Sequence, residues 1–112
     1  MANEFANAQK VGVTTVQTVY TAAAGKTCIM LELEIANTTS AVVEASVEVL
    51  DYNDSTTVWR YLVKNAPVPA GGSLMVIAGQ KIVLEATDAV RVTASAANVM
   101  DVVAAILEDV NE

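Results

Sequence analysis

Along most of this 112-residue chain, apolar and polar residues alternate at every second position, which is typical of strands that bury one face. The run from Cys28 to Asn37 shows this pattern clearly. Its expected core face consists of Ile29, Leu31, Leu33 and Ile35, and its expected solvent face of Met30, Glu32 and Glu34. This run predicts a strand packed on a core.

A second alternating run extends from Val42 to Asp51. Its expected inward residues are Val43, Ala45, Val47 and Val49, and its expected outward residues are Glu44, Ser46 and Glu48. The residues between the two runs, Asn37-Thr38-Thr39-Ser40, favour a turn. We therefore expect the two strands to form a hairpin.

Further short runs follow at the spacing of an all-β domain, separated by segments rich in Gly, Pro, Asn and Asp. The expected strands are Val13 to Thr21, Val58 to Lys64, Ser73 to Ile77, Lys81 to Leu84, Val90 to Ser95 and Val99 to Glu108, with a turn at Ala78-Gly79. Short links without a helical crossover predict an antiparallel β-sandwich of about eight short strands. A jelly roll and an immunoglobulin-like topology both fit this pattern. We expect one sandwich domain over residues 11–112, preceded by an N-terminal arm over residues 1–10.

The last run is apolar on both faces. Val102, Ala104 and Ile106 fall on one face, and Val103, Ala105 and Leu107 fall on the other. A two-layer sandwich buries one face of each sheet, so a partner subunit is the expected cover for the second face. A strand covered on both sides within the domain and a short helix are the alternatives.

Candidate chemistry is sparse. The chain has no His, which removes the commonest general base and the commonest metal ligand. The single Cys28 begins an apolar strand, so we interpret it as a buried, inert thiol. We interpret carboxylate pairs such as Glu32 and Glu34 as a solvated face of a sheet and not as a catalytic pair. We expect no enzymatic activity, no metal and no cofactor.

Charge and hydropathy bear on partners. The net charge is −7 and the six basic residues are scattered, so no nucleic-acid surface is expected. The longest apolar runs, Cys28 to Ile35 and Val99 to Leu107, contain carboxylates and are too short for a membrane-spanning helix. The N-terminus lacks the features of a secretory signal and Cys28 is unpaired, so we expect a protein made in the cytosol.

The aromatic residues offer a further candidate surface. Along Val58 to Lys64, Trp59 and Tyr61 fall on one face, with Arg60 and Lys64 on the other. The pair fits core or rim packing, or an anchor at a protein interface. If Trp59 formed an exposed patch with Tyr20 and Tyr52, a receptor or carbohydrate-binding module would become the better interpretation.

Several turn-and-strand phrases are similar to those of a known group. They are Thr18-Val19-Tyr20-Thr21, Ala24-Gly25-Lys26-Thr27, Ile35-Ala36-Asn37-Thr38, Leu62-Val63-Lys64-Asn65-Ala66-Pro67-Val68-Pro69, Lys81-Ile82-Val83-Leu84-Glu85 and Val92-Thr93-Ala94-Ser95-Ala96. From Val11 onward the chain resembles the small β-sandwich virion structural proteins of tailed bacteriophages, especially marine and cyanobacterial ones. It departs at Ala23, where related phrases often carry Pro.

The resemblance implies a virion component that is assembled in the host cytoplasm as a homo-oligomer, with a trimer as the expected state. Its partners would be the major capsid protein or neck and tail proteins. We expect a capsid decoration or cement protein, with a neck, collar or tail-fibre accessory subunit as the alternative. The expected interface residues are Phe5, which would anchor the N-terminal arm on a neighbouring subunit or on the capsid shell, and Trp59, Tyr61, Val103, Ala105 and Leu107.

Overall fold

The computed structural model of this protein describes residues 4–13, 16–50, 59–96 and 99–108. These residues form eight strands and no helix, so none of them belongs to a helix that could cross a membrane. The strands are β1 (Glu4–Val13), β2 (Gln17–Thr21), β3 (Cys28–Asn37), β4 (Val43–Leu50), β5 (Trp59–Val68), β6 (Ser73–Leu84), β7 (Ala89–Ala94) and β8 (Met100–Glu108).

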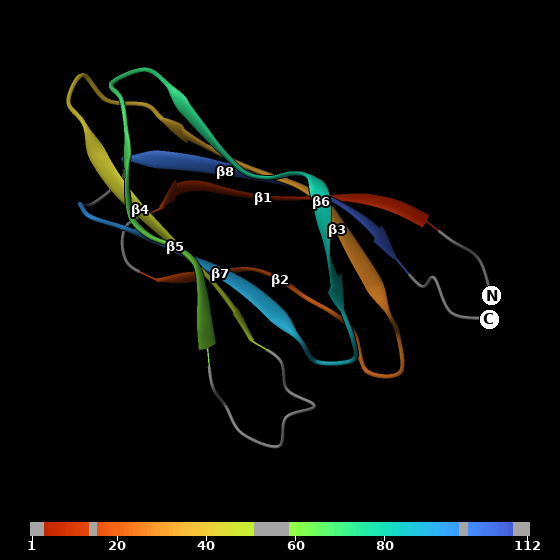
Figure 1. Cartoon of the computed structure of the whole chain (residues 1–112). Coiled ribbons are helices and arrows are strands. Elements are labelled where there is room, and N and C mark those ends of the chain that lie inside the picture. The colour runs from red at the N-terminus through yellow and green to blue at the C-terminus, as the bar shows by residue number, and fades with distance from the viewer. Residues whose placement is uncertain (1–3, 14–15, 51–58, 97–98, 109–112) are drawn as a thin grey trace.

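The strands form two layers of four, and Figure 1 shows how they are arranged. Sheet A has the order β1-β8-β3-β6, and sheet B has the order β2-β7-β4-β5. Every pairing is antiparallel. The first four strands pair with the last four in reverse order, β1 with β8, β2 with β7, β3 with β6 and β4 with β5. This is the wrapped hairpin of a jelly roll, so the predicted sandwich is confirmed and its topology is decided.

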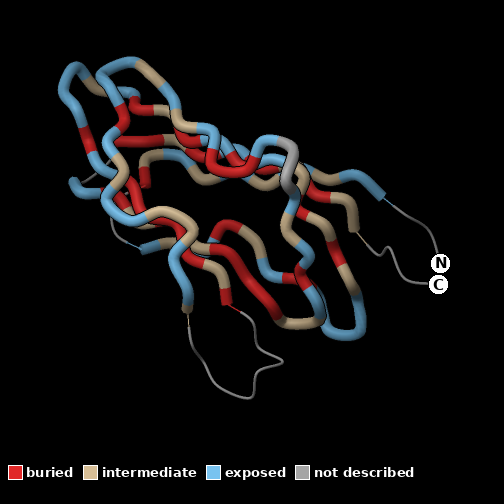
Figure 2. The backbone as a smooth tube through the Cα atoms, in the orientation of Figure 1, coloured by how far each residue is buried: buried red, intermediate tan, exposed pale blue. Residues whose placement is uncertain are grey.

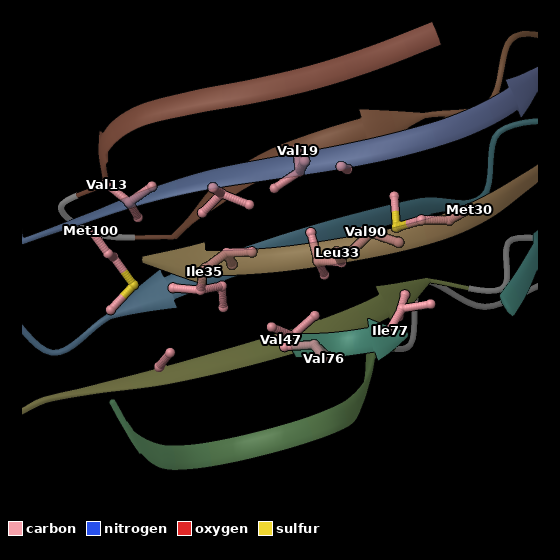
Figure 3. Packing of buried hydrophobic residues seen from close by; sticks show 14 of the residues in the cluster. Val13, Val19, Met30, Leu33, Ile35, Val47, Val76, Ile77, Val90 and Met100 are labelled. Atoms are coloured by element: carbon pink, nitrogen blue, oxygen red, sulfur yellow. The ribbon is translucent and has the colours of Figure 1, made fainter. Parts of the chain in front are cut away.

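The core lies between the two layers, and buried and less buried residues alternate along many strands (Figure 2). Both sheets contribute large apolar side chains that meet in the middle (Figure 3). Fully buried members include Met30, Leu33 and Ile35 from β3, Ile77 from β6, Ile106 from β8, Val47 from β4 and Val90 from β7. The side-chain packing between the sheets holds the two layers together.

The predicted hairpin of the first two alternating runs is wrong, because β3 lies in sheet A and β4 in sheet B. The side chain of Asn37 holds the crossing. Its Nδ2 donates to the carbonyl oxygens of Ala41 at 2.7 Å, Val68 at 3.0 Å and Pro69 at 3.1 Å, and its Oδ1 accepts from the Thr39 amide at 2.9 Å. These bonds satisfy a buried amide and direct the chain across the sandwich instead of back along β3.

The predicted faces of β3 are correct only in its second half. Leu33 and Ile35 are buried, but at the start of the strand Cys28 and Met30 face the core while Ile29 and Leu31 are half-buried. The register with β8 explains the change, since Met30 pairs with Ile106 and Glu32 with Ala105. Leu31 is therefore an extra residue, a β-bulge that exchanges the two faces of the strand.

Among the expected boundaries that differ from the structure, two concern β6 and β1. The expected turn at Ala78-Gly79 lies inside β6, which extends from Ser73 to Leu84 and whose register with β3 shifts between Ala78 and Ile82. The expected division between residues 10 and 11 lies inside β1, whose residues Glu4 to Lys10 pair with β8. Residues 1–3 of the expected arm lie outside the described residues, and the contact of this segment with a neighbouring subunit stays a prediction.

Two turns depend on glycine. Gly25 has a φ of 77° in the turn where the Lys26 amide donates to the Ala23 carbonyl, and Gly71 has a φ of 68° in the turn where the Gly72 amide donates to Pro69. Both glycines are the third residue of their turn, and glycine adopts the positive φ found there without steric cost. These turns join β2 to β3 and β5 to β6, and so connect the two sheets.

Candidate interaction surface

The residues of β8 fall on two faces as the alternation predicts, but in the structure of this chain the two faces differ in burial. Val102, Ala104 and Ile106 are buried in the core, while Ala105 and Leu107 are half-buried and Val103 is 49% exposed. The second apolar face of β8 thus lies on the outside of sheet A. No described part of the chain forms a third layer over it.

An apolar row crosses all four strands of this outer face. Directly opposite residues of antiparallel strands share a face, and the register aligns Phe5 with Leu107, Leu107 with Ile29, and Ile29 with Val83. Phe5 is 80% exposed and Val83 is 60% exposed, at the two edges of the sheet. We call these four residues, Phe5, Leu107, Ile29 and Val83, the apolar row.

The neighbouring rows mix apolar and acidic side chains. Gln9, Val103, Glu34 and Met75 align in one row, and Asn7, Ala105, Glu32 and Ala78 align in another. Val103 and Met75 are both about half exposed, at 49% and 46%, and Glu32 and Glu34 are exposed. These three rows contain two carboxylates and no basic residue. The face therefore offers apolar contact area beside negative charge.

The structure brings together four of the six predicted interface residues. Phe5, Val103, Ala105 and Leu107 share the outer face of sheet A, with Phe5 directly opposite Leu107. Trp59 and Tyr61 lie on β5, at the edge of sheet B in the other layer. The six residues therefore do not form a single surface.

Trp59 and Tyr61 do share the outer face of sheet B, as the alternation predicts. The Arg91 guanidinium lies 4.0 Å from the centre of the Trp59 ring, and Lys64 Nζ lies 5.3 Å from the centre of the Tyr61 ring. The prediction that Lys64 faces away from Tyr61 is wrong. Opposite β4, Val47 pairs with Val63 and Glu48 with Tyr61, so β5 has an extra residue that shifts the later side chains to the other face.

The aromatic patch expected of a carbohydrate-binding module does not assemble from the described residues. Tyr20 on β2 and Trp59 on β5 lie on opposite edge strands of sheet B. Tyr52 falls outside the described residues. The Tyr20 hydroxyl turns toward sheet A, where it donates to Glu108 Oε2 and lies 3.4 Å from the Cys28 sulfur.

Burial raises the pKa of the Tyr20 hydroxyl far above its usual range, and the hydrogen bonds to Cys28 and Glu108 raise it further. Cys28 is a free thiol that is 1% exposed. Together these side chains join β2 of sheet B to β3 and β8 of sheet A. Their arrangement stabilises the edge of the sandwich.

Within the described ranges, no group of three or more His, Cys, Asp or Glu side chains is arranged to hold a metal ion.

The sequence pattern did not predict two members of the apolar row. Ile29 was expected in the core because the bulge at Leu31 has no local signal, and Val83 lacked a role until the register placed it beside Ile29.

Comparisons with known proteins find a likeness among solved structures. No protein-family model and no curated protein matches the chain. Among solved structures, the chain is similar to one from the T13 viral particle of infectious bursal disease virus (IBDV), with a TM-score of 0.49 and 10% identity over 95% of this chain. It is also similar to a chain of the virus of the Gx strain, with a TM-score of 0.49 and 12% identity over 96% of this chain.

The chain spans 30% of the length of each of those two viral chains. Both solved structures are of a virus, and at this identity and TM-score the likeness carries no function across.

Proposed function

We propose that this chain is a virion structural protein that attaches to a capsid surface as a decoration or cement protein, with the outer face of sheet A as its attachment surface. The observation that carries the proposal is the apolar row, which crosses the whole width of the sheet on a face that the described chain leaves uncovered. The phage-like phrases of the sequence support the virion setting.

The attachment uses contact area and needs no reaction. Transferring exposed side chains such as Val83 and Phe5 from water into an interface contributes on the order of 1–2 kcal/mol each, before the costs of association are subtracted. A capsid presents the same site many times, so a modest interface per copy is sufficient to act on the whole shell.

The charge of the face specifies the partner surface. Glu32 and Glu34 flank the apolar contacts, and these rows contain no basic residue. The complementary surface therefore carries an apolar strip with Lys or Arg beside it, because buried or nearby like charges would oppose binding. Neck, collar and tail proteins with such an apolar and basic surface would bind this face for the same reason. The proposal also includes a homo-oligomer of this chain.

A pair of matched variants tests the attachment surface. Val83→Glu places a charge within the apolar row, and Val42→Glu makes the same change at a valine that is 65% exposed and lies outside sheet A. Particles that lack this chain are mixed with each purified variant and sedimented. We expect the Val83 variant to lose at least tenfold in affinity and the Val42 variant to bind like the unmodified chain. Equal binding by both variants would contradict the proposed surface.

A further inference from the structure

The edge strand β1 has one paired side and one free side. Its segment from Glu4 to Lys10 pairs residue for residue with Glu108 to Val102 of β8, and the register shifts only after Lys10. Within the described part of the chain, no strand pairs with the opposite side of β1. Unpaired strand edges are ready templates for another strand.

Two of the features that usually block edge pairing are missing from this segment. It contains no proline and no bulge, and its single lysine stands at the end, at Lys10. The irregularity lies beyond it, where Gly12 has a φ of 62° and its amide donates to Asp101 Oδ1 at 2.9 Å. Seven consecutive residues therefore form a regular, accessible edge.

We propose that the occupant of this edge is β1 of a second copy of the chain, paired antiparallel about a two-fold axis at Asn7. Opposite residues must share a face, so odd positions pair with odd positions and even with even. Asn7 is the midpoint of the regular segment from Glu4 to Lys10. Placing Asn7 opposite Asn7 of the second copy is the register that pairs all seven residues.

This register is complementary in charge. It places Glu4 opposite Lys10 of the second copy, and the symmetry creates the same pair twice. Within one chain, Glu4 stands directly opposite Glu108, and like charges in that position are unfavourable. Lys10 of the second copy would approach Glu4 from its other side and reduce this repulsion.

The register also gives partners to the most exposed apolar residue of β1. Phe5, which is 80% exposed, would stand opposite Gln9 of the second copy, with Val11, which is 78% exposed, as a diagonal neighbour. The two-fold axis is perpendicular to the sheet, so sheet A becomes a continuous sheet of eight strands with both apolar rows on the same side. A dimer of this kind would attach through two equivalent faces at once.

The inference rests on the homo-oligomer within the proposed function and replaces the expected trimer with a two-fold pair. Cysteine cross-linking tests the register. Directly opposite residues have Cα atoms about 4.5–5.5 Å apart, within reach of a disulfide. We expect Asn7→Cys to form a covalent dimer rapidly under mild oxidation. Gln9→Cys is the control, because its copies would lie about 13 Å apart along the strands.

The unmodified chain is a second control, because it measures any disulfide cross-linking through its own Cys28, which is 1% exposed. Cross-linking of the Asn7 variant that is no faster than that of the Gln9 variant would overturn the inference. A trimer in solution without Asn7 cross-linking would overturn it as well.

A charge exchange tests the same register without introducing cysteine. Glu4→Lys and Lys10→Glu each create two like-charged pairs across the axis, so each is expected to raise the dimer dissociation constant by about tenfold. The double variant restores both opposite-charge pairs and should dimerise like the unmodified chain. A double variant as weak as the single ones would contradict the register.

Sedimentation of the same variants with particles separates the two proposals. A chain that stays monomeric and still binds particles overturns the dimer and leaves the attachment surface intact. A chain that dimerises through Asn7 without binding particles overturns the attachment surface and leaves the dimer intact.

Discussion

Arg91 on β7 and Glu48 on β4 lie directly opposite each other and form a bidentate ion pair. Arg91 Nε lies 3.0 Å from Glu48 Oε1, and Nη2 lies 3.2 Å from Oε2. Glu48 was expected on a solvent-exposed face, yet it is only 8% exposed. The guanidinium is also stacked on Trp59, so one cation serves both a buried carboxylate and an aromatic ring.

This pair should show strong energetic coupling. Arg91→Met leaves the Glu48 carboxylate without its partner and should lower the free energy of unfolding by about 2 kcal/mol, a value reduced from that of a fully buried pair because Arg91 is partly exposed. The double variant with Glu48→Gln should lose less than the sum of the single losses, by about 1 kcal/mol. Chemical denaturation of the unmodified chain, the two single variants and the double variant measures this double-mutant cycle. Additive losses of unfolding free energy would contradict the coupling.

Asn37 should be essential for the crossing between the sheets. Its side chain is buried and bonds to three carbonyl oxygens and to the Thr39 amide. Asn37→Ala leaves several of these groups unsatisfied and should cost about 2–4 kcal/mol of unfolding free energy. Asn37→Asp keeps the acceptor and loses the donor, so it should also be strongly destabilised. Thermal melting of both variants tests this, and a change below about 0.5 kcal/mol would speak against it.

The bulge at Leu31 makes a prediction about two residues of the same strand. Leu33 is fully buried, so Leu33→Ala should cost about 2–5 kcal/mol of stability. Ile29 faces outward in the apolar row, so Ile29→Ala should cost under about 1.5 kcal/mol and should weaken particle binding instead. Urea unfolding and particle sedimentation report the two effects separately. Equal destabilisation by the two changes would place Ile29 in the core after all.

Stability should fall at high pH through Tyr20. Its pKa in the folded chain is raised above the ordinary value of 10.0, chiefly by burial. Below pH 10 the hydroxyl is neutral in both states, and above it the unfolded state loses the proton first, so the stabilisation present at lower pH is lost as the pH rises. Urea unfolding between pH 8 and about pH 11 should show this decline.

The matching variant identifies the group responsible. Tyr20→Phe removes the hydroxyl, so its unfolding free energy should decline less steeply above pH 10 than that of the unmodified chain. Absorbance at the tyrosinate band offers an independent measurement, since the raised pKa of Tyr20 should make its hydroxyl ionise well above the ordinary pH range of a tyrosine. The same steep decline in Tyr20→Phe would remove Tyr20 from the explanation.

Period-two alternation predicted the sandwich and the faces of β8, because side-chain direction in a regular strand depends only on parity. It failed at Leu31 and in the middle of β5, where one extra residue reverses the parity of all that follow. Such bulges are set by the register with neighbouring strands, which a single sequence does not display.

The strand topology was harder to predict from the sequence for the same reason. The jelly roll is defined by pairs such as β1 with β8 and β2 with β7, whose partners are far apart in the chain. The turn-forming phrase at Asn37 predicted a change of direction but not the sheet that the chain would enter. The apolar row likewise needed the register, since its four residues come from four different strands.

The most direct test of the attachment surface is electron cryo-microscopy of virions that carry this chain, with the chain located in the density. We predict that the outer face of sheet A lies against the shell, with Ile29, Val83 and Leu107 in contact with a strip that is apolar and flanked by Lys or Arg. A chain whose sheet A outer face points into solvent while sheet B or the loops contact the shell would contradict this account.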